Sequence, residues 1–222
     1  PELSRGLGDV YKRQEQTPLS ALALAVLADR AGIPAGVINI VNGMDAPAIG
    51  QELTSNPAVR KVTFTGSTEV GRILMKQSAD TIKKVSLELG GNAPLIIFDD
   101  ADIDIAVRET MASKFRNAGQ TCVCANRIFV QAGIYDDFAA ALTEKVAAMS
   151  VGNGADDGVV TGPLIDRQGL EKVERHVADA VAKGAEVRTG GSAHSLGGTF
   201  FEPTVLTGMT SEMQVFGEET FG

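Results

Sequence analysis

Hydrophobic residues along the chain follow two repeating patterns. In some stretches they recur every three to four positions, which indicates a helix with one buried face. In others they form short continuous runs, which are typical of buried strands. We expect helices at residues 18–31, 46–54, 68–78, 102–115, 134–149 and 167–183, and strands at 37–41, 61–65, 84–89, 94–98, 127–130, 186–188 and 204–206. Because strands and helices alternate, the sequence predicts an α/β fold with a mostly parallel sheet and helices on both faces.

An apolar run at residues 21–28 resembles a secretory signal peptide, because basic residues precede it. Its surroundings favour an ordinary helix of a folded domain. Thr17 is a suitable N-cap, Pro18 suits the first helical position, and Gly32 follows the end of the run. No run reaches the ~20 apolar residues that a membrane span requires, so we expect no membrane partner.

Composition excludes several classes of function. The net charge of −8 and the lack of a basic stripe argue against a nucleic-acid partner. Trp is absent and aromatic residues make up 5% of the chain, so platforms for base stacking are not expected either. Two cysteines and two histidines are too few for a disulfide scaffold or a tetrahedral zinc site. We therefore expect no metal and a reducing, cytoplasmic location.

Residues 1–14 carry a signature of non-native sequence. The stretch from Asp9 to Gln14 can be back-translated to GAT GTG TAT AAG AGA CAG, which resembles the transposon end used in sequencing-library adapters. We therefore interpret residues 1–14 as an artefact joined to a truncated gene. The remainder divides near Gly90-Gly91 into residues 15–90 and residues 91–222.

Two short stretches carry residues suited to covalent chemistry. Cys122 lies within residues 115–126, and Glu88 lies upstream within residues 87–94. A thiol can act as a nucleophile and a carboxylate as a general base, and the small residues around both would let a substrate approach. Taken singly, a buried cysteine is more often an inert small hydrophobe, and Glu88 more often a solvated carboxylate at a strand end. The two stretches together favour the catalytic interpretation.

Both stretches resemble the active-site signatures of the NAD(P)-dependent aldehyde dehydrogenases, and the resemblance runs from about Glu15 to Gly222. Arg116 and the Cys-Val-Cys triplet are most similar to the succinate-semialdehyde dehydrogenase branch of that family. The resemblance implies that residues 15–90 are part of a parallel-sheet dinucleotide-binding domain and residues 91–222 an α/β catalytic domain, truncated at its C-terminus. It also implies that these domains face each other across the active site, and that the complete protein is a dimer or tetramer.

The resemblance assigns roles to the two chemical residues. Cys122 would attack the aldehyde as a thiolate, and Glu88 would activate the water that hydrolyses the resulting thioester. Asn117, Gly119, Gln120 and Thr121 are poor core residues that precede a segment suited to start a helix, and a helix N-terminus would favour the thiolate form of Cys122. The backbone N–H of Cys122 would stabilise the oxyanion, together with a family asparagine expected upstream of this sequence.

The strand, turn and helix at residues 61–71 form a candidate nucleotide site. Gly66 lets the backbone approach a ligand, and Ser67 can cap a helix whose first N–H groups favour a phosphate. Neither a G-x-G-x-x-G fingerprint nor a P-loop is present, so the turn alone indicates only a capped helix. The resemblance places the turn over the cofactor diphosphate and adds Leu89, with Glu219 and Phe221 at the nicotinamide ribose and ring.

Glu15 bears on the choice of cofactor. It matches a family position near the adenosine ribose, where a carboxylate can hydrogen-bond the 2′-hydroxyl and would repel a 2′-phosphate. We expect NAD or NADP as cofactor, and this residue slightly favours NAD.

Arg116 and Cys124 bear on substrate choice and regulation. Arg116 matches the family position that binds the far carboxylate of a semialdehyde, and a guanidinium can grip a carboxylate through two hydrogen bonds. A surface arginine is the alternative. Cys124 is a candidate redox residue that could form a strained disulfide with Cys122, and a small buried side chain is the equal alternative.

We therefore expect oxidation of succinate semialdehyde to succinate with NAD(P)+, through a thiohemiacetal and a thioester on Cys122. The alternatives are another aldehyde dehydrogenase, acting on glutarate semialdehyde or an uncharged aldehyde, and a non-catalytic relative that binds nucleotide. A thiol hydrolase would need a histidine partner. We expect neither His176, in a polar helix pattern, nor His194, in a glycine-rich loop, to serve as one. We also expect this stretch to be inactive alone.

Overall fold

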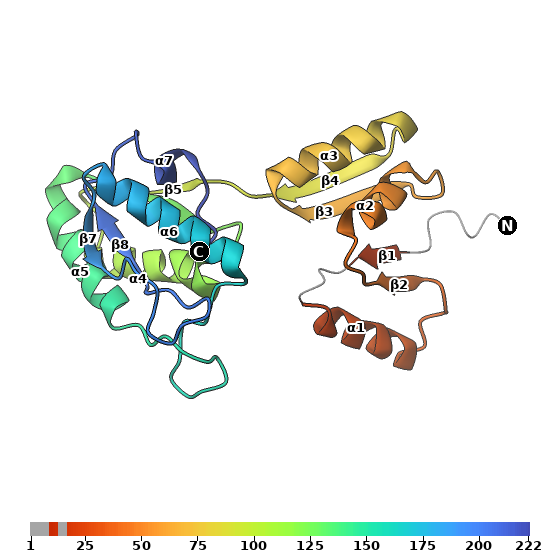
Figure 1. Cartoon of the computed structure of the whole chain (residues 1–222), viewed down its shortest axis with the longest axis horizontal. Helices are drawn as coiled ribbons and strands as arrows, with labels where there is room; N and C mark the ends of the chain where they lie inside the picture. The colour runs from red at the N-terminus through yellow and green to blue at the C-terminus, as the bar shows by residue number, and fades with distance from the viewer. Residues whose placement is uncertain (1–8, 13–16) are drawn as a thin grey trace. The chain divides into compact units, whose positions relative to one another are not determined.

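The computed structural model of the protein describes residues 9–12 and 17–222. The chain divides into two compact units, Pro1–Leu89 and Gly90–Gly222, and each unit is described by itself (Figure 1). The division falls beside the Gly90-Gly91 pair.

The first unit is built from two pairs of parallel strands with helices between them. Its elements are β1 (Asp9–Lys12), α1 (Leu19–Arg30), β2 (Ile38–Val41), α2 (Ala46–Ser55), β3 (Lys61–Gly66), α3 (Thr68–Ser78), the short 3-10 helix η2 (Ala79–Thr81) and β4 (Lys84–Leu89). Strand β1 pairs with β2 and β3 pairs with β4, both in parallel. Parallel pairing needs a crossover, and the helices between the strands supply it.

Local capping explains where the helices of this unit begin. The Asp45 carboxylate accepts the N–H of Ala48 at 3.0 Å at the start of α2, and the Ser67 hydroxyl accepts the N–H of Val70 at 3.3 Å at the start of α3. The predicted N-cap of α1 was wrong. Pro18 rather than Thr17 occupies that position, and it makes no side-chain cap. Pro18 has helical backbone angles and its carbonyl accepts the N–H of Leu22 at 3.1 Å, so the helix boundary lies one residue after the predicted one.

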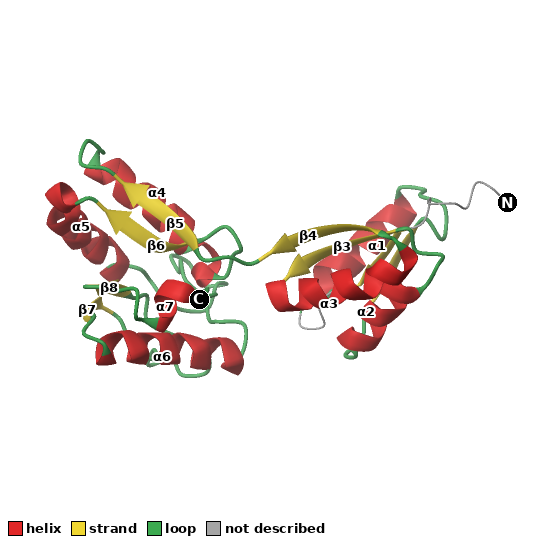
Figure 2. Cartoon of the chain, turned by 90° about the horizontal axis from the view of Figure 1, so that it is seen from above, coloured by secondary structure: helices red, strands yellow, loops and turns green. Residues whose placement is uncertain are grey.

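The second unit continues the α/β pattern. Its elements are β5 (Ala93–Ile97), α4 (Ile103–Lys114), the 3-10 helix η3 (Arg116–Gly119), β6 (Ala125–Val130), the 3-10 helix η4 (Ala132–Ile134), α5 (Tyr135–Ala147), α6 (Arg167–Ala182), β7 (Glu186–Thr189), β8 (Val205–Thr207) and α7 (Gln214–Gly217). Strands β5 and β6 are parallel, whereas β7 and β8 are antiparallel. Figure 2 shows α4 and α5 beside the β5–β6 pair, and α6 beside β7 and β8.

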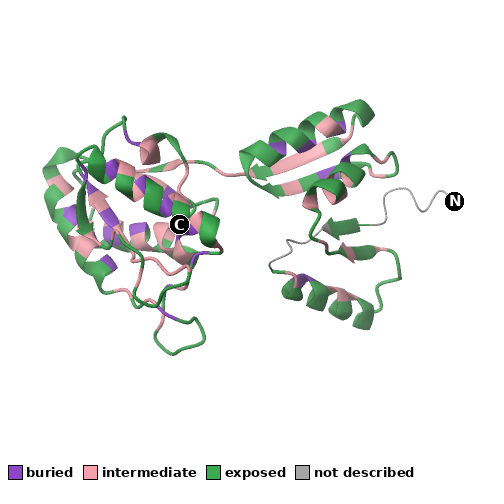
Figure 3. Ribbon diagram, in the orientation of Figure 1, coloured by how far each residue is buried: buried purple, intermediate pink, exposed green. Residues whose placement is uncertain are grey.

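The largest core cluster of the protein lies in this second unit. It joins buried residues of β5, α4, α5 and β8, namely Ile97, Val107, Phe138, Leu142, Val146 and Val205. Figure 3 shows buried positions in purple on helices and strands of this unit. A smaller cluster of Leu164, Leu170 and Val173 packs along α6. Burial of an apolar side chain of this size stabilises the fold by about 1.5–3 kcal/mol. The two clusters therefore hold α4 and α6 in place within this unit.

The predicted α/β class is confirmed, and every predicted helix and strand is present with its ends shifted by two residues at most. Strand β1 and the short helix α7 were not predicted. Strand β1 lies within residues 1–14, whose non-native origin stays a proposal that sequencing of the source gene across Gln14 would test. Within residues 9–12 and 17–222, no helix is both long and apolar enough to cross a membrane.

Candidate active site

Four of the residues that we proposed from the sequence meet at one edge of the first unit. Strands β3 and β4 run in parallel with Thr65 opposite Glu88 and Gly66 opposite Leu89. Gly66 and Leu89 therefore end their strands side by side, and Ser67 follows directly as the N-cap of α3. The carboxyl ends of parallel strands, beside a helix N-terminus, are where α/β folds commonly bind nucleotides.

The packing behind this edge depends on a missing side chain. A Cβ at Gly71 of α3 would come within 2.6 Å of a methyl carbon of Leu89, so glycine lets the helix lie close to β4. The first turn of α3 remains exposed at Ser67, Thr68 and Glu69. Backbone N–H groups of a first helical turn have no partner inside the helix, so this turn can donate to an anionic ligand.

Glu88 is the only acidic residue of β4, and its side chain is exposed. Its carboxylate makes no hydrogen bond or ion pair with any residue in the described ranges, whereas its backbone belongs to the β3–β4 pair. The carboxylate is therefore free to accept a proton from water, which is the requirement for a general base.

The loop that carries the thiol follows α4 and has an unusual backbone. Asn117 and Ala118 both have φ of 54°, and Gly119 has φ of 74°, so three successive residues are left-handed. Such angles are strained for residues with a side chain and persist only where the surroundings enforce them. A Cβ at Gly119 would lie 2.6 Å from the carbonyl oxygen of Gly222, so this loop packs directly on the last residues of the chain.

Polar contacts from two sides hold this left-handed turn. The Asn117 amide donates to the carbonyl of Gln120, and the Gln120 amide donates to the carbonyl of Asn117, both at 3.2 Å. The side-chain oxygen of Gln120 also accepts the N–H of Ile165 at 2.8 Å. The segment before the cysteine is thus braced without belonging to any regular helix.

The prediction that a helix begins at Cys122 was wrong. Cys122 lies in a turn, closed by a bond from the N–H of Cys124 to the carbonyl of Thr121, and strand β6 begins at Ala125. The left-handed run ahead of the turn directs the chain into the strand. The helix N-terminus that we expected beside this thiol is therefore replaced by a turn.

The backbone around Cys122 fits a different part of the prediction. Cys122 is exposed. The N–H groups of Thr121, Cys122 and Val123 donate to no acceptor within residues 9–12 and 17–222. These free N–H groups lie beside an exposed sulfur. They can donate hydrogen bonds to the negatively charged oxygen that develops on an attacked carbonyl, as an oxyanion hole requires.

Cys124 and Arg116 flank this turn in contrasting environments. Cys124 is 1% exposed, and its sulfur lies 2.6 Å from the Thr121 hydroxyl and 3.6 Å from the carbonyl oxygen of Lys114. Arg116 is exposed at the start of η3, and its guanidinium pairs with no carboxylate in the described part of the chain. An unpaired guanidinium in the loop that carries Cys122 is available to an anionic ligand.

Glu219 shows the clearest fit to a bound cofactor. A Cβ at Gly90 would overlap its carboxylate, so the carboxylate is held against the backbone at the start of this unit. Its Oε1 is buried and has no hydrogen-bond partner among the described residues. Because an unpartnered buried acceptor is costly, it calls for a donor such as a ribose hydroxyl. Phe221 is 43% exposed two positions along, and Glu15 lies outside the described residues.

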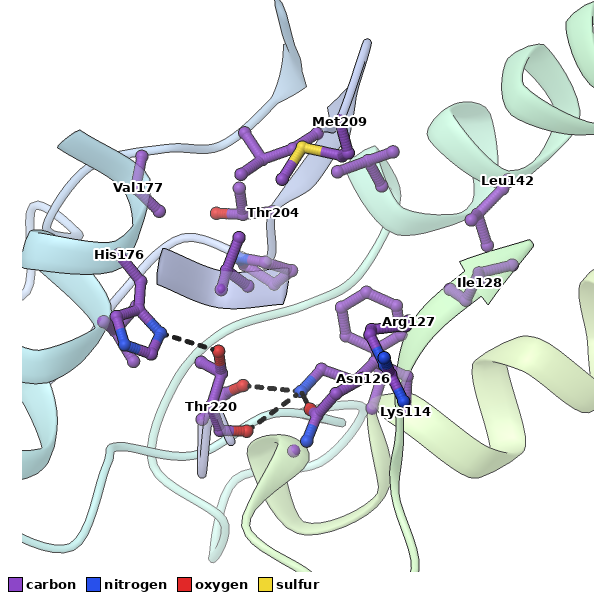
Figure 4. Close-up of a pocket in the computed structure, with 18 of the residues that line it drawn as sticks. Lys114, Asn126, Arg127, Ile128, Leu142, His176, Val177, Thr204, Met209 and Thr220 are labelled. Atoms are coloured by element: carbon purple, nitrogen blue, oxygen red, sulfur yellow. Dashed lines mark hydrogen bonds between the residues drawn. The ribbon is translucent and has the colours of Figure 1, made fainter. Parts of the chain in front are cut away.

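Two functional candidates escaped the sequence analysis. A cavity of about 420 Å³ in the second unit is lined mainly by apolar side chains, with the polar ends of Lys114, His176 and Thr220 exposed in its wall (Figure 4). His176 was expected to lie in a polar helix pattern, but it is 2% exposed on the inner face of α6. Its ring nitrogens contact Thr220 and Glu218 rather than a thiol. Within residues 9–12 and 17–222, no group of acidic, His and Cys side chains could hold a metal ion.

With this geometry in place, comparison with known proteins identifies the family. Residues 2–222 match the aldehyde dehydrogenase family. The chain belongs to that family, as its resemblance to the two active-site signatures predicted.

Three relatives resemble the chain over all 222 residues. Succinate-semialdehyde dehydrogenase [NADP(+)] GabD of Escherichia coli (strain K12) is 61% identical, and the match covers 100% of this chain and 46% of the relative. Glutarate-semialdehyde dehydrogenase of Pseudomonas aeruginosa is 60% identical and 3-sulfolactaldehyde dehydrogenase of Pseudomonas putida 59%, again over 100% of this chain and 46% of each relative. The chain thus spans about half the length of these relatives.

A solved structure shares the fold. The crystal structure of succinate-semialdehyde dehydrogenase from Burkholderia pseudomallei superposes with a TM-score of 0.95 at 59% sequence identity, covering 97% of this chain and 44% of that one. The α/β architecture of both units is therefore that of an aldehyde dehydrogenase.

Proposed function

We propose that the complete protein containing this chain oxidises an aldehyde with an anionic group at its far end, succinate semialdehyde first, to the carboxylic acid with NAD(P)+ and water. The observation that carries this proposal is the Cys122 turn. An exposed sulfur, free backbone N–H groups and an unpaired guanidinium at Arg116 occupy one short loop. A nucleophile, an oxyanion site and an anion receptor are the parts that this reaction requires.

The residues of the chain divide the chemistry between them. The Cys122 sulfur adds to the aldehyde carbon and forms a thiohemiacetal, whose oxyanion accepts hydrogen bonds from the neighbouring backbone N–H groups. A bound nicotinamide supplies the hydride acceptor. Cys122 then carries the oxidised carbon as a thioester, and Glu88 takes a proton from the water that hydrolyses it.

Two sets of residues would hold the dinucleotide. Gly66, Ser67 and Leu89 lie together at the carboxyl edge of β3 and β4, beside the first turn of α3, which suits a diphosphate. Glu219 offers its unpartnered Oε1 to a ribose hydroxyl, and Phe221 offers an exposed ring. The slight preference for NAD rests on Glu15 alone, whereas the printed name of the Escherichia coli relative specifies NADP(+). We therefore propose either dinucleotide as the cofactor.

The names of the relatives support an anionic substrate without selecting one. They act on succinate semialdehyde, glutarate semialdehyde and 3-sulfolactaldehyde, each of which carries a carboxylate or sulfonate away from the reacting carbonyl. Arg116 would bind that group through paired N–H donors. Arg116 would bind the anionic group of all three substrates. The substrate panel below therefore compares aldehydes of different length.

A panel of substrates and cofactors tests this function on the complete gene product. We expect kcat/KM for succinate semialdehyde to exceed that for hexanal by at least about tenfold, the difference that one charged hydrogen-bonded pair supplies. Glutarate semialdehyde and sulfolactaldehyde, each with NAD+ and NADP+, complete the panel. A preference for hexanal would remove the role of Arg116, and binding of dinucleotide without oxidation of any aldehyde would favour the non-catalytic alternative.

Location and assembly are further parts of the proposal. We propose a reducing compartment, the cytoplasm, because the two cysteines are free thiols in the structure. We also propose a homodimer or homotetramer for the complete protein, since residues 15–222 resemble an oligomeric family. Light scattering on the purified complete protein tests the second point, and a monomer at working concentration would contradict it.

A further inference from the structure

The last residues of the chain, 218–222, have no regular backbone pairing of their own. Within residues 9–12 and 17–222, the one bond between main-chain groups from this segment runs from the N–H of Glu218 to the carbonyl of Gln214, at the end of α7. Glu219 and Phe221, the proposed cofactor residues, lie in this segment. A segment without a hydrogen-bonded ladder keeps a fixed course only if side chains from other elements hold it.

His176 holds the segment from α6. Its Nδ1 lies 2.8 Å from the Thr220 hydroxyl and its Nε2 lies 3.2 Å from a carboxylate oxygen of Glu218. A carboxylate accepts but does not donate, so Nε2 carries the proton and Nδ1 accepts the hydroxyl proton of Thr220. Both bonds are satisfied by a neutral ring, and burial lowers the pKa of His176, which keeps the ring neutral.

Lys114 holds the same segment from the end of α4. Its Nζ donates to the carbonyl oxygen of Gly222 at 2.8 Å, to that of Thr220 at 3.5 Å, and to the Asn126 side-chain oxygen at 2.8 Å. These contacts use the three donors of the ammonium group. Figure 4 shows His176 and Lys114 reaching Thr220 from opposite sides.

Lys114 also links this segment to the loop of the nucleophile. Its own carbonyl accepts the thiol of Cys124, two residues after Cys122, and η3 begins two residues after Lys114. Gly119 of that loop packs against the carbonyl of Gly222. One half-buried residue, Lys114, therefore connects the cysteine loop to the segment that carries Glu219.

We propose that His176 and Lys114 are positioning residues that clamp residues 218–222 and so set the carboxylate of Glu219 for the cofactor ribose. His176 bonds the hydroxyl of Thr220 and Lys114 bonds its carbonyl oxygen, and Glu219 directly precedes Thr220 in the chain. Neither clamp residue needs to touch a ligand. The proposal rests on the proposed function, because it assigns the clamped carboxylate to the dinucleotide.

The test uses the complete gene product and measures the dissociation constant for NAD+ and NADP+ together with kcat and the aldehyde KM. His176→Phe keeps the ring volume but removes both bonds, and we expect cofactor affinity to fall at least about tenfold, as the loss of one neutral bond and one bond to a carboxylate predicts. We expect the aldehyde KM to stay within about twofold of the wild-type value. His176→Gln, which can still donate to Glu218, should recover part of the loss. His194→Phe, at the other histidine of the chain, is the matched control and should change nothing.

Several outcomes would overturn the clamp. Unchanged cofactor affinity in folded His176→Phe would do so, as would an equal loss in cofactor affinity and aldehyde KM, which indicates general damage. If His176→Phe does not fold, Thr220→Val removes only the hydroxyl. Cofactor affinity should then fall about threefold, as one lost hydrogen bond predicts. Unchanged cofactor affinity in Thr220→Val would contradict the clamp. A wild-type protein that binds no dinucleotide would instead refute the proposed function.

Discussion

Cys122 and Cys124 are separated by a single residue, but their sulfur atoms have opposite environments. Cys122 is exposed in its turn, whereas Cys124 is 1% exposed and bonded to the Thr121 hydroxyl and the Lys114 carbonyl. The chain reverses direction between them as it enters β6, which begins at Ala125. One thiol is therefore accessible from solvent while the other belongs to the core.

This contrast predicts selective alkylation. Native protein treated with iodoacetamide should be modified at Cys122 at least about tenfold faster than at Cys124, because reaction requires an accessible thiolate. Peptide mapping by mass spectrometry after timed quenching measures both rates. Unfolded protein should lose the difference and serves as the control. Equal rates in the native protein would contradict the environments described above.

The proposed disulfide between the two cysteines stays a prediction with a structural condition. Cys124 must leave its bonds to Thr121 and Lys114 before its sulfur can reach Cys122, so oxidation should be slow and should loosen the Lys114 contacts. Counting free thiols before and after peroxide treatment tests it. Loss of activity with both thiols still free would count against this regulation.

Arg116 should determine the preference for anionic aldehydes. Arg116→Ala in the complete protein removes an exposed guanidinium that has no partner in the described part of the chain, so folding should be unaffected. We expect kcat/KM for succinate semialdehyde to fall tenfold or more, which corresponds to about 1.5–3 kcal/mol of lost transition-state binding. The value for hexanal should be nearly unchanged. Arg108→Ala, at an exposed arginine of α4 paired with Glu109, is the matched control. A parallel loss for both aldehydes would mean that Arg116 does not contact the substrate.

Glu88 should act after hydride transfer. Glu88→Gln keeps the shape of the side chain but removes the base, so reduced cofactor should appear in a burst that is followed by slow turnover. Stopped-flow absorbance of the reduced nicotinamide records both phases. Glu174→Gln, at an exposed carboxylate of α6, should behave as the wild type. Equal slowing of burst and turnover would remove Glu88 from the hydrolytic step.

His176 should make stability depend on pH in the acid range. Burial lowers the pKa of His176. The hydrogen bond to Glu218 raises this pKa, and the positive charges of Lys172 and Arg175 lower it further. Below about pH 6.5 the His176 ring binds a proton in the unfolded chain but not yet in the folded protein. Its contribution to the free energy of unfolding is therefore complete above that pH and declines as the pH falls towards the lowered pKa. The thermal midpoint should therefore drop more between pH 7.5 and 5.5 in the wild type than in His176→Gln. His194→Gln should follow the wild type, and a drop unchanged by His176→Gln would contradict this pKa direction.

The local elements could be predicted because each is specified by nearby residues. Helix α3 begins at Thr68, directly after its N-cap Ser67, and ends at Ser78 as predicted, because cap and apolar period agree. The edge formed by Gly66 and Leu89 followed from two parallel strands of equal length. Local information also indicated the cysteine and its neighbours, because small and polar residues there are poor core formers.

The features that escaped prediction depend on contacts between distant residues. The left-handed run includes Ala118, a residue type that rarely adopts positive φ, and packing of Gly119 against Gly222 accompanies it. His176 stands among charged residues in the sequence, and its burial follows from partners at positions 218 and 220. A helix start at Cys122 was therefore a reasonable local expectation that tertiary packing overrode.

The most direct test of the central claim is to find the acyl group on its sulfur. The complete protein carrying Glu88→Gln is mixed with succinate semialdehyde and NAD+ or NADP+, quenched in acid within the burst, digested and analysed by mass spectrometry. We predict a succinyl thioester on the peptide that contains Cys122, absent without cofactor and absent in the double variant with Cys122→Ala. An acyl group on another residue, or none on Cys122 while reduced cofactor accumulates, would contradict the mechanism.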